Sequence, residues 1–295
     1  MALEISLLHP TFGGEVSGID LAIAPDANTV ATLREAMDRY AVLVFPAQHL
    51  TDENQIEFAR LFGTLERSAF TYRPGTTHRL KQPEMVDVSN LDASTGTPLP
   101  SDARHRMINL GNRLWHTDSS FKSPCGALSM LYAHAVPPTG GETEFADMRS
   151  AYDSLPAETR AGLDGLVAEH SLMHSREKLG FTDFSPEERA ALPSACHPLV
   201  RTNPRTGRKA LYLASHASHI IGMPVADSRL LLMELIEHAT AREFVYRHQW
   251  RVGDLVVWDN RCTMHRGRAF DESYPRDLRR VTTSHVEQDT RVATQ

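Results

Sequence analysis

Short apolar runs and longer helix-like segments alternate along the chain. Runs of strand length, rich in branched and aromatic residues, predict strands at 16–21, 41–45, 198–202, 210–213, 244–250, 254–258 and 278–284. Apolar residues spaced three and four apart predict helices at 28–39, 51–62, 147–155, 156–167 and 225–240. The clearest helix is 225–240, where we expect one apolar side made of Leu230, Met233, Leu235 and Ile236.

The order of these elements favours one fold class. The two strands at 198–202 and 210–213 flank a turn rich in Asn, Pro and Gly, which predicts a hairpin. No regular β-α-β rhythm runs through the chain, so a parallel sheet is not expected. The pattern instead predicts a mainly β protein with peripheral helices (α+β), built on a jelly-roll core.

Residues 71–112 form the most polar stretch, and its turn residues predict long loops. Such a stretch is either a lid over a binding site or a plain surface loop. No linker or repeat is visible, so we expect residues 1–295 to form a single domain. We also expect a cytoplasmic protein without a membrane partner, because no apolar run approaches the ~20 residues of a membrane span and the N-terminus does not resemble a secretory signal.

Composition narrows the function classes. Hydrophobic residues make up 41% and charged residues 23% of the chain, as in ordinary globular proteins. The formal charge of −6 argues against nucleic acid as a partner. Three cysteines at irregular spacing argue against a disulfide framework. The 15 histidines point to metal or proton chemistry. Motifs of phosphate-binding loops, dinucleotide-binding folds, zinc proteases and serine hydrolases are absent.

His116 and Asp118 are candidate metal ligands. Residues i and i+2 of a strand share one face, so these two side chains should project together. An imidazole and a carboxylate are two of the three ligands in the facial triad that holds non-haem Fe(II). A histidine and an acidic residue two positions apart also occur by chance in a chain of this composition. A second such pair, at 285–287, lies in the polar tail and shows that the pair alone is weak evidence. His265, after the apolar run 255–258, could be the third ligand or simply a turn or core histidine.

Two arginines near the C-terminus are candidate anion ligands. Arg276, Leu278 and Arg280 should share one face of a strand, with Asp277 and Arg279 on the other. Guanidinium forks suit carboxylates, so this face could clamp a dicarboxylate beside a metal. The alternative is a solvated basic edge strand.

With these motifs the chain resembles the Fe(II)/2-oxoglutarate-dependent dioxygenases of the taurine dioxygenase and 2,4-dichlorophenoxyacetate dioxygenase family. The resemblance spans nearly the whole chain and rests on segments 13–21, 41–46, 115–121, 137–145, 197–202 and 258–265. Three further segments resemble the phenoxyacetate branch rather than the taurine branch, namely 146–156, 216–219 and 242–250.

The resemblance implies a double-stranded β-helix (cupin-like) core and a set of site residues. The family's iron ligands fall on His116, Asp118 and His265. Residues that hold the distal carboxylate of 2-oxoglutarate fall on Thr143 and Arg276, and Arg280 falls near the proximal carboxylate. Thr143 could also be an ordinary threonine at the exit of the Gly140-Gly141 turn.

The implied cofactors are Fe(II), the cosubstrate 2-oxoglutarate and O₂. The implied reaction hydroxylates an aryloxyalkanoate such as 2,4-dichlorophenoxyacetate next to its ether oxygen, giving a phenol and glyoxylate, with succinate and CO₂. For the anionic substrate we expect contact with Arg280 first and His216 second, although His216 could equally be structural. Alternatives are a taurine, alkylsulfonate or alkyl sulfate ester dioxygenase, or a metal-binding jelly roll without oxygenase activity. A homo-oligomer is possible.

Overall fold

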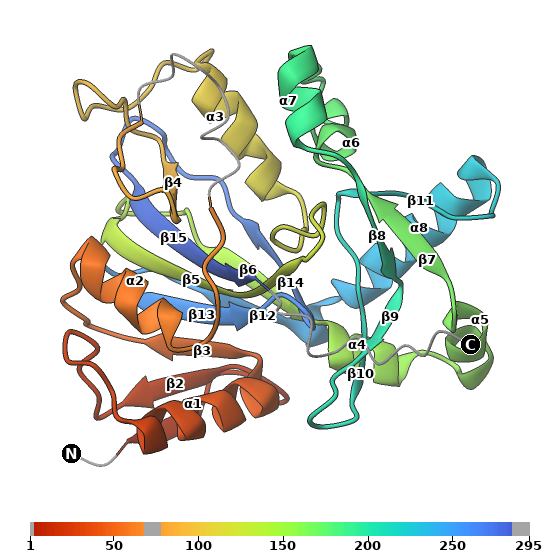
Figure 1. Cartoon of the computed structure of the whole chain (residues 1–295), viewed down its shortest axis with the longest axis horizontal. Coiled ribbons are helices and arrows are strands. Elements are labelled where there is room, and N and C mark those ends of the chain that lie inside the picture. The colour runs from red at the N-terminus through yellow and green to blue at the C-terminus, as the bar shows by residue number, and fades with distance from the viewer. Residues whose placement is uncertain (1–2, 68–77, 285–295) are drawn as a thin grey trace.

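The computed structural model describes residues 3–67 and 78–284. Its largest sheet has seven strands (Figure 1), in the order β1 (Glu4–Leu7), β2 (Gly14–Ser17), β3 (Val42–Phe45), β13 (Leu255–Asp259), β5 (Gly126–Ala135), β15 (Asp277–Ser284) and β4 (Met85–Ser89). All neighbours in this sheet are antiparallel except β2 and β3. Strands far apart in the sequence therefore lie side by side.

A three-stranded sheet completes the core, in the order β12 (Val245–His248), β6 (Thr143–Asp147) and β14 (Thr263–Gly267). Phe145 of this sheet packs against Leu131, Trp258 and Leu278 of the large sheet, in a fully apolar cluster. Two antiparallel sheets that enclose a common apolar layer form a jelly roll. The mainly β, double-stranded β-helix fold expected from the sequence is confirmed.

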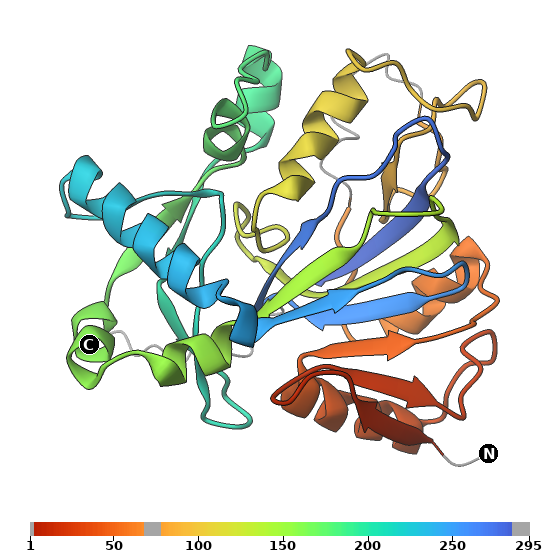
Figure 2. The same ribbon diagram turned by 180° about the vertical axis from the view of Figure 1, so that it is seen from behind.

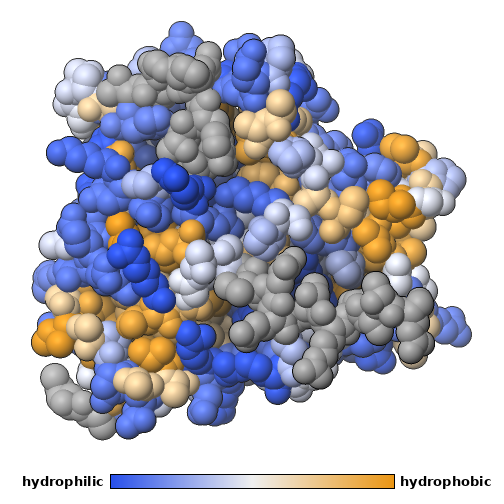
Figure 3. Space-filling view, viewed as in Figure 1, coloured by the Kyte–Doolittle hydropathy of each residue, from blue (hydrophilic) through white to orange (hydrophobic). Residues whose placement is uncertain are grey.

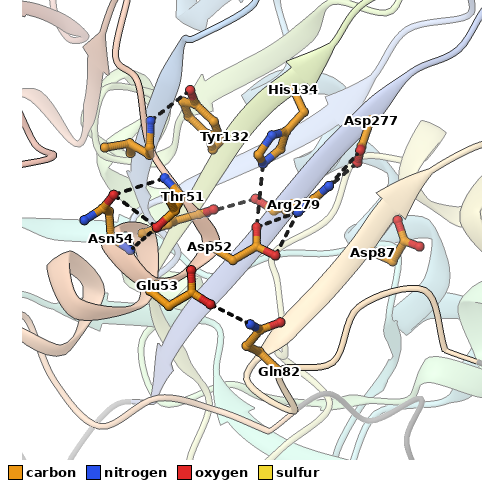
Figure 4. Close-up of polar contacts among 12 residues, drawn as sticks. Thr51, Asp52, Glu53, Asn54, Gln82, Asp87, Tyr132, His134, Asp277 and Arg279 are labelled. Atoms are coloured by element: carbon orange, nitrogen blue, oxygen red, sulfur yellow. Dashed lines mark hydrogen bonds and ion pairs between the residues drawn. The ribbon is translucent and has the colours of Figure 1, made fainter.

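Helices cover the opposite face of the large sheet. Leu33 and Met37 of α1 (Ala27–Tyr40) and Ile56 of α2 (Asp52–Arg60) pack against that face. β3, β5 and β13 are therefore buried on both faces, which explains their continuous apolar runs. A capping box formed by Thr51 and Asn54 begins α2, as Figure 4 shows. Both helices confirm the predictions at 28–39 and 51–62.

A second group of elements packs beside the two sheets. It comprises α4 (Met148–Ser154), α5 (Ala157–Leu163), β7 (Val167–His170), α6 (Leu172–Glu177), α7 (Pro186–Ala191), β8 (Ala195–Pro198), β9 (Val200–Thr202), β10 (Lys209–Leu211), β11 (Ala217–Ile220) and α8 (Val225–Ala239), followed by a 3-10 turn at Arg242–Phe244. β9 and β10 form the predicted hairpin. Seen from behind in Figure 2, α8 lies across the sheet β11-β7-β8.

Two regions differ from the sequence prediction. The stretch 71–112 is not only loop, because its described part contains β4, α3 (Arg104–Asn109) and a 3-10 helix at Leu110–Arg113. α3 buries no residue, so its sequence needs no apolar side with helical spacing, and no side chain caps its N-terminus. The sequence therefore lacks both signals by which a helix is predicted. The helix expected at 156–167 ends at Leu163, since Gly165 adopts a left-handed conformation and β7 follows.

The buried side of α8 also differs from the expectation. Leu230 and Met233 are 53% and 58% exposed, whereas Leu232 and Leu235 are buried. Apolar residues occur on both sides of this helix, so spacing alone does not decide which side faces the core. Figure 3 shows apolar residues gathered at the right-hand edge, where β11 leads into α8. No helix in the described ranges is long and apolar enough to cross a membrane.

Candidate active site

A pair of backbone hydrogen bonds brings His116 and His265 together. The His116 amide donates to the carbonyl of His265 at 3.0 Å, and the His265 amide donates back at 2.8 Å. Their rings lie 4.1 Å apart, measured between centroids. His265 belongs to β14, whereas His116 forms only this isolated bridge and Asp118 follows in a turn. The strand expected at 116–118 is therefore wrong, because the chain turns after one bridge.

The turn nevertheless brings three candidate ligands to one point. One ligand atom each from His116, Asp118 and His265 lies within 4.8 Å of the others, and all three residues are buried. Thr117 holds the turn from behind, donating its hydroxyl to the carbonyls of Leu213 (2.9 Å) and Thr263 (3.2 Å). The similar pair at 285–287 lies outside the described residues.

The Asp118 carboxylate is oriented by a network of buried polar groups. Ser129 Oγ donates to Asp118 Oδ2 at 2.7 Å, and Arg280 donates to Oδ1. Asn260 Nδ2 donates to Ser129 Oγ at 2.9 Å, while its Oδ1 accepts from the Trp258 indole at 3.0 Å and the Asp118 amide at 3.2 Å. Such contacts behind a metal ligand fix its direction.

Burial and charge set the protonation of the three ligands. Burial lowers the pKa of His116 and of His265, so both imidazoles are neutral at pH 7. Burial would raise the pKa of Asp118, but the charge of Arg280 and the hydrogen bond from Ser129 bring it down to about 2. The Leu114 carbonyl lies 2.8 Å from His116 Nδ1 and accepts a hydrogen bond from it. The proton of the neutral ring is therefore on Nδ1, and Nε2 is free to bind a metal. Two neutral imidazoles and one carboxylate fit Fe(II).

A cavity of about 100 Å³ opens beside the two histidines, and Thr143, Arg276 and Arg280 line it. Trp250 Nε1 donates to Thr143 Oγ1 at 3.0 Å, which leaves the threonine proton free to donate into the cavity. The structure thus brings together the metal candidates and the three residues expected to bind 2-oxoglutarate.

Arg276 is a buried cation in need of an anion. Its guanidinium donates only to the carbonyls of Val88 (3.4 Å) and Gly141 (3.2 Å), and no carboxylate among residues 3–67 and 78–284 pairs with it. Burial lowers its pKa to about 10, so it still carries its charge at neutral pH. Because a buried charge is stable only when it is compensated, this group fits an anionic ligand.

The two faces of β15 differ as expected from the alternation of side chains. On the face away from the cavity, Arg279 Nη1 donates to Asp52 at 2.7 Å and Nη2 to Asp277 at 3.1 Å (Figure 4). Arg79 forms ion pairs with Asp87, at 2.7 Å, and with Asp277. Arg280 faces the metal candidates instead.

His216 does not line this cavity, although it lies close to it. Its side chain is buried, and its ring centroid lies 6.1 Å from that of His116. Its Nδ1 lies 2.9 Å from Ser175 Oγ. Sequence reasoning missed Ser129 and Asn260. Ser129 is a fully buried polar residue within the apolar strand β5, and that interruption was the available signal.

Comparison with known proteins places the chain in a family. The model of the Taurine catabolism dioxygenase TauD, TfdA family matches residues 4–282. The chain is 50% identical over 283 residues to an alpha-ketoglutarate-dependent 2,4-dichlorophenoxyacetate dioxygenase of Cupriavidus pinatubonensis, covering 96% of this chain and 98% of that one. It is 39% identical over 282 residues to an (S)-phenoxypropionate/alpha-ketoglutarate-dioxygenase of Sphingobium herbicidovorans, covering 93% and 92%.

The solved structures agree with the sequence relatives. A crystal structure of AAD-2 in complex with Mn(II) and N-oxalylglycine superimposes with a TM-score of 0.91 at 50% identity, covering 97% of this chain and 99% of that one. The buried His116, Asp118 and His265 cluster and the arginine-lined cavity beside it lie within the matched region. The chain therefore belongs to the TauD, TfdA family of dioxygenases.

Proposed function

We propose that the protein is an Fe(II)- and 2-oxoglutarate-dependent dioxygenase that hydroxylates an aryloxyalkanoate such as 2,4-dichlorophenoxyacetate. One observation carries the proposal: three buried ligand atoms converge next to a cavity that contains an uncompensated arginine, Arg276. The 50% identity to a 2,4-dichlorophenoxyacetate dioxygenase supports the substrate class.

His116, Asp118 and His265 would hold the Fe(II). Once bound, Fe(II) with 2-oxoglutarate and O₂ supplies the oxidation that converts a C–H bond to C–OH and 2-oxoglutarate to succinate and CO₂. The Ser129 hydroxyl keeps Asp118 turned toward the histidines. Arg280 compensates the Asp118 charge and lowers the pKa of that carboxyl to about 2, so the carboxylate is ionised at neutral pH.

Thr143 and Arg276 would bind the distal carboxylate of 2-oxoglutarate, and Arg280 the region of its proximal carboxylate. A hydroxyl donor and a guanidinium fork in a buried cavity match a carboxylate in charge and geometry. Arg280 and His216 remain our predicted contacts to the substrate. Hydroxylation of the carbon next to the ether oxygen gives a hemiacetal, which breaks down to the phenol and glyoxylate.

Succinate formation tests this proposal with a panel of phenoxyacetates, taurine and alkyl sulfates. We expect turnover of 2,4-dichlorophenoxyacetate that depends on both Fe(II) and 2-oxoglutarate. Taurine turnover without aryloxyacetate turnover would overturn the substrate assignment. Metal binding without 2-oxoglutarate binding would favour a jelly roll without oxygenase activity.

Replacing a candidate iron ligand tests the metal assignment. Asp118→Ala removes the only anionic ligand of the cluster, so turnover should fall below detection while the circular dichroism spectrum keeps its folded form. His238→Ala is the control, because that histidine bonds to Ala151 of α4 and lies outside the cluster. Full activity of Asp118→Ala would show that the assignment is wrong.

Three broader expectations stay proposals with their own tests. We infer that residues 1–295 form one catalytic domain, which limited proteolysis would test. We infer a cytoplasmic location, which cell fractionation would test; the three free cysteines are compatible with a reducing compartment. Light scattering would show whether the protein forms a homo-oligomer.

A further inference from the structure

Arg176, at the C-terminal end of α6, is a second buried arginine without a counter-charge. Arg176 is only 5% exposed. Nη1 donates to Ser175 Oγ at 2.9 Å, Nε has no hydrogen-bond partner, and no carboxylate in the described ranges pairs with the guanidinium. Burial lowers its pKa to about 10, which leaves it charged at neutral pH. An unpaired buried charge costs several kcal/mol, roughly, so an anionic partner would be strongly stabilising.

The guanidinium packs against Gly111, in the segment that borders the cavity beside the metal cluster. A Cβ atom placed on Gly111 would lie 2.3 Å from both Cζ and Nη1 of Arg176, so only glycine leaves room for it. The neighbours of Gly111, Leu110 and Asn112, line the cavity that also contains His116. The positive charge of Arg176 also acts on His116, because it contributes to lowering the pKa of that imidazole.

Ser175 joins Arg176 to His216. The Ser175 hydroxyl donates to the Leu172 carbonyl at 2.7 Å and accepts from Arg176 Nη1. It therefore also accepts from Nδ1 of His216, 2.9 Å away, and this bond fixes the imidazole. The His216 ring stands edge-on to His116 at 6.1 Å and to Phe121 at 5.1 Å. Arg176 and His216 thus form one preorganised unit, beside the metal cluster and apart from Arg276.

The cavity lined by Arg276 is small. Its volume of about 100 Å³ suits a small dicarboxylate, whereas pockets for larger organic ligands measure roughly 300–1,000 Å³. Arg280 pairs with Asp118 and is already assigned to the proximal carboxylate of 2-oxoglutarate. Among the described residues, Arg176 is therefore the buried cation near His116 that neither the metal nor 2-oxoglutarate would use.

We propose that Arg176 binds the carboxylate of the substrate, with His216 held beside it by Ser175. This inference rests on the proposed function and adds a residue that anchors the anionic end. A guanidinium fork binds a carboxylate through two parallel hydrogen bonds, and buried bonds of this kind discriminate strongly against a neutral analogue.

Calorimetry on the protein loaded with Mn(II) and N-oxalylglycine tests the anchor without turnover. The two probes are 2,4-dichlorophenoxyacetate and its uncharged amide. Wild-type protein should prefer the acid, and Arg176→Gln should weaken acid binding about 30-fold or more while changing amide binding little. Arg60→Gln, on the exposed side of α2, is the matched control.

Gly111→Ala provides a second variant that keeps Arg176 but displaces its guanidinium. It should weaken acid binding in the same selective way, even if Arg176→Gln fails to fold. Retention of the wild-type acid preference by either folded variant would overturn the anchor alone. Wild-type protein that binds neither probe would overturn the proposed function and the anchor with it.

Discussion

At the scale of single residues, the site depends on how a few charges are compensated. Asp118 is ionised because Arg280 lies against it, whereas Arg276 and Arg176 have no carboxylate partner in the described ranges. A site for a metal and two organic anions requires two things. The charge of the carboxylate ligand must be balanced within the protein, and the arginines that receive the anions must lack a carboxylate partner.

Arg276, which directly precedes β15, and Arg279, which lies within it, allow a matched comparison. Arg276→Gln should raise the KM for 2-oxoglutarate at least about 30-fold, because the distal carboxylate loses its buried charged partner. Arg279→Gln should leave this KM within a factor of about two, since Arg279 bonds to Asp52 and Asp277 on the other face (Figure 4). Steady-state kinetics with varied 2-oxoglutarate measures both. Equal effects of the two changes would contradict the assignment of faces.

The metal ligands and the two arginines Arg276 and Arg280 could be found from the sequence, whereas Arg176 and the residues that orient the ligands could not. Spacing and family resemblance pointed to His116, Asp118, His265 and the arginines. Ser129, Asn260 and Arg176 act through contacts between segments far apart in the chain, such as the packing of the Arg176 guanidinium against Gly111. No local pattern records such an approach.

At the scale of elements, long-range pairing decides local structure at the site. β14 pairs with the segment at His116 through one isolated bridge. That bridge brings together His116 and His265, which are far apart in the sequence. Strand alternation predicted the two faces of β15 correctly because that strand is central and long. The same reasoning was wrong at 116–118, where the backbone turns after one bridge.

The exposed side of α8 leads to a stability prediction. Leu235→Ala should lower the free energy of unfolding by about 2–5 kcal/mol, because it empties part of the packed core. Leu230→Ala should change it by less than about 0.5 kcal/mol, since Leu230 is exposed. Urea denaturation of both variants measures the difference. A larger loss for Leu230→Ala would mean that another surface covers this side in solution.

At the scale of the whole molecule, two mainly antiparallel sheets hold the site, and helices cover the outer face of the larger sheet. The sequence predicted this class because the strands are short, apolar and lack a β-α-β rhythm. It did not predict α3, β4 or the sheet β11-β7-β8, whose sequences are partly polar and whose order depends on tertiary contacts.

Buried histidines away from the metal cluster make the fold sensitive to acid. Burial lowers the pKa of His170 to about 3 and that of His197 to about 4. The unfolded chain takes up these protons near pH 6.5, before the folded protein does. Stability is therefore complete above pH 6.5 and is lost as the pH falls, by about 2 kcal/mol per histidine down to pH 5.

Replacing one of these histidines should make the protein less sensitive to pH. Both ring nitrogens of His170 are buried without a hydrogen-bond partner, so His170→Phe removes a titrating group without breaking a bond. Urea denaturation at pH 8 and pH 5 should show a loss of stability about 2 kcal/mol smaller than in the wild-type protein. An unchanged loss would show that His170 is protonated in the folded state.

The most direct test of the account is the stoichiometry of one reaction. Purified protein receives Fe(II), 2-oxoglutarate, O₂ and 2,4-dichlorophenoxyacetate, and the products are quantified together. We expect 2,4-dichlorophenol, glyoxylate and succinate in equal amounts, and none of them from Asp118→Ala. Succinate without phenol, or phenol formed without 2-oxoglutarate, would contradict the proposed reaction.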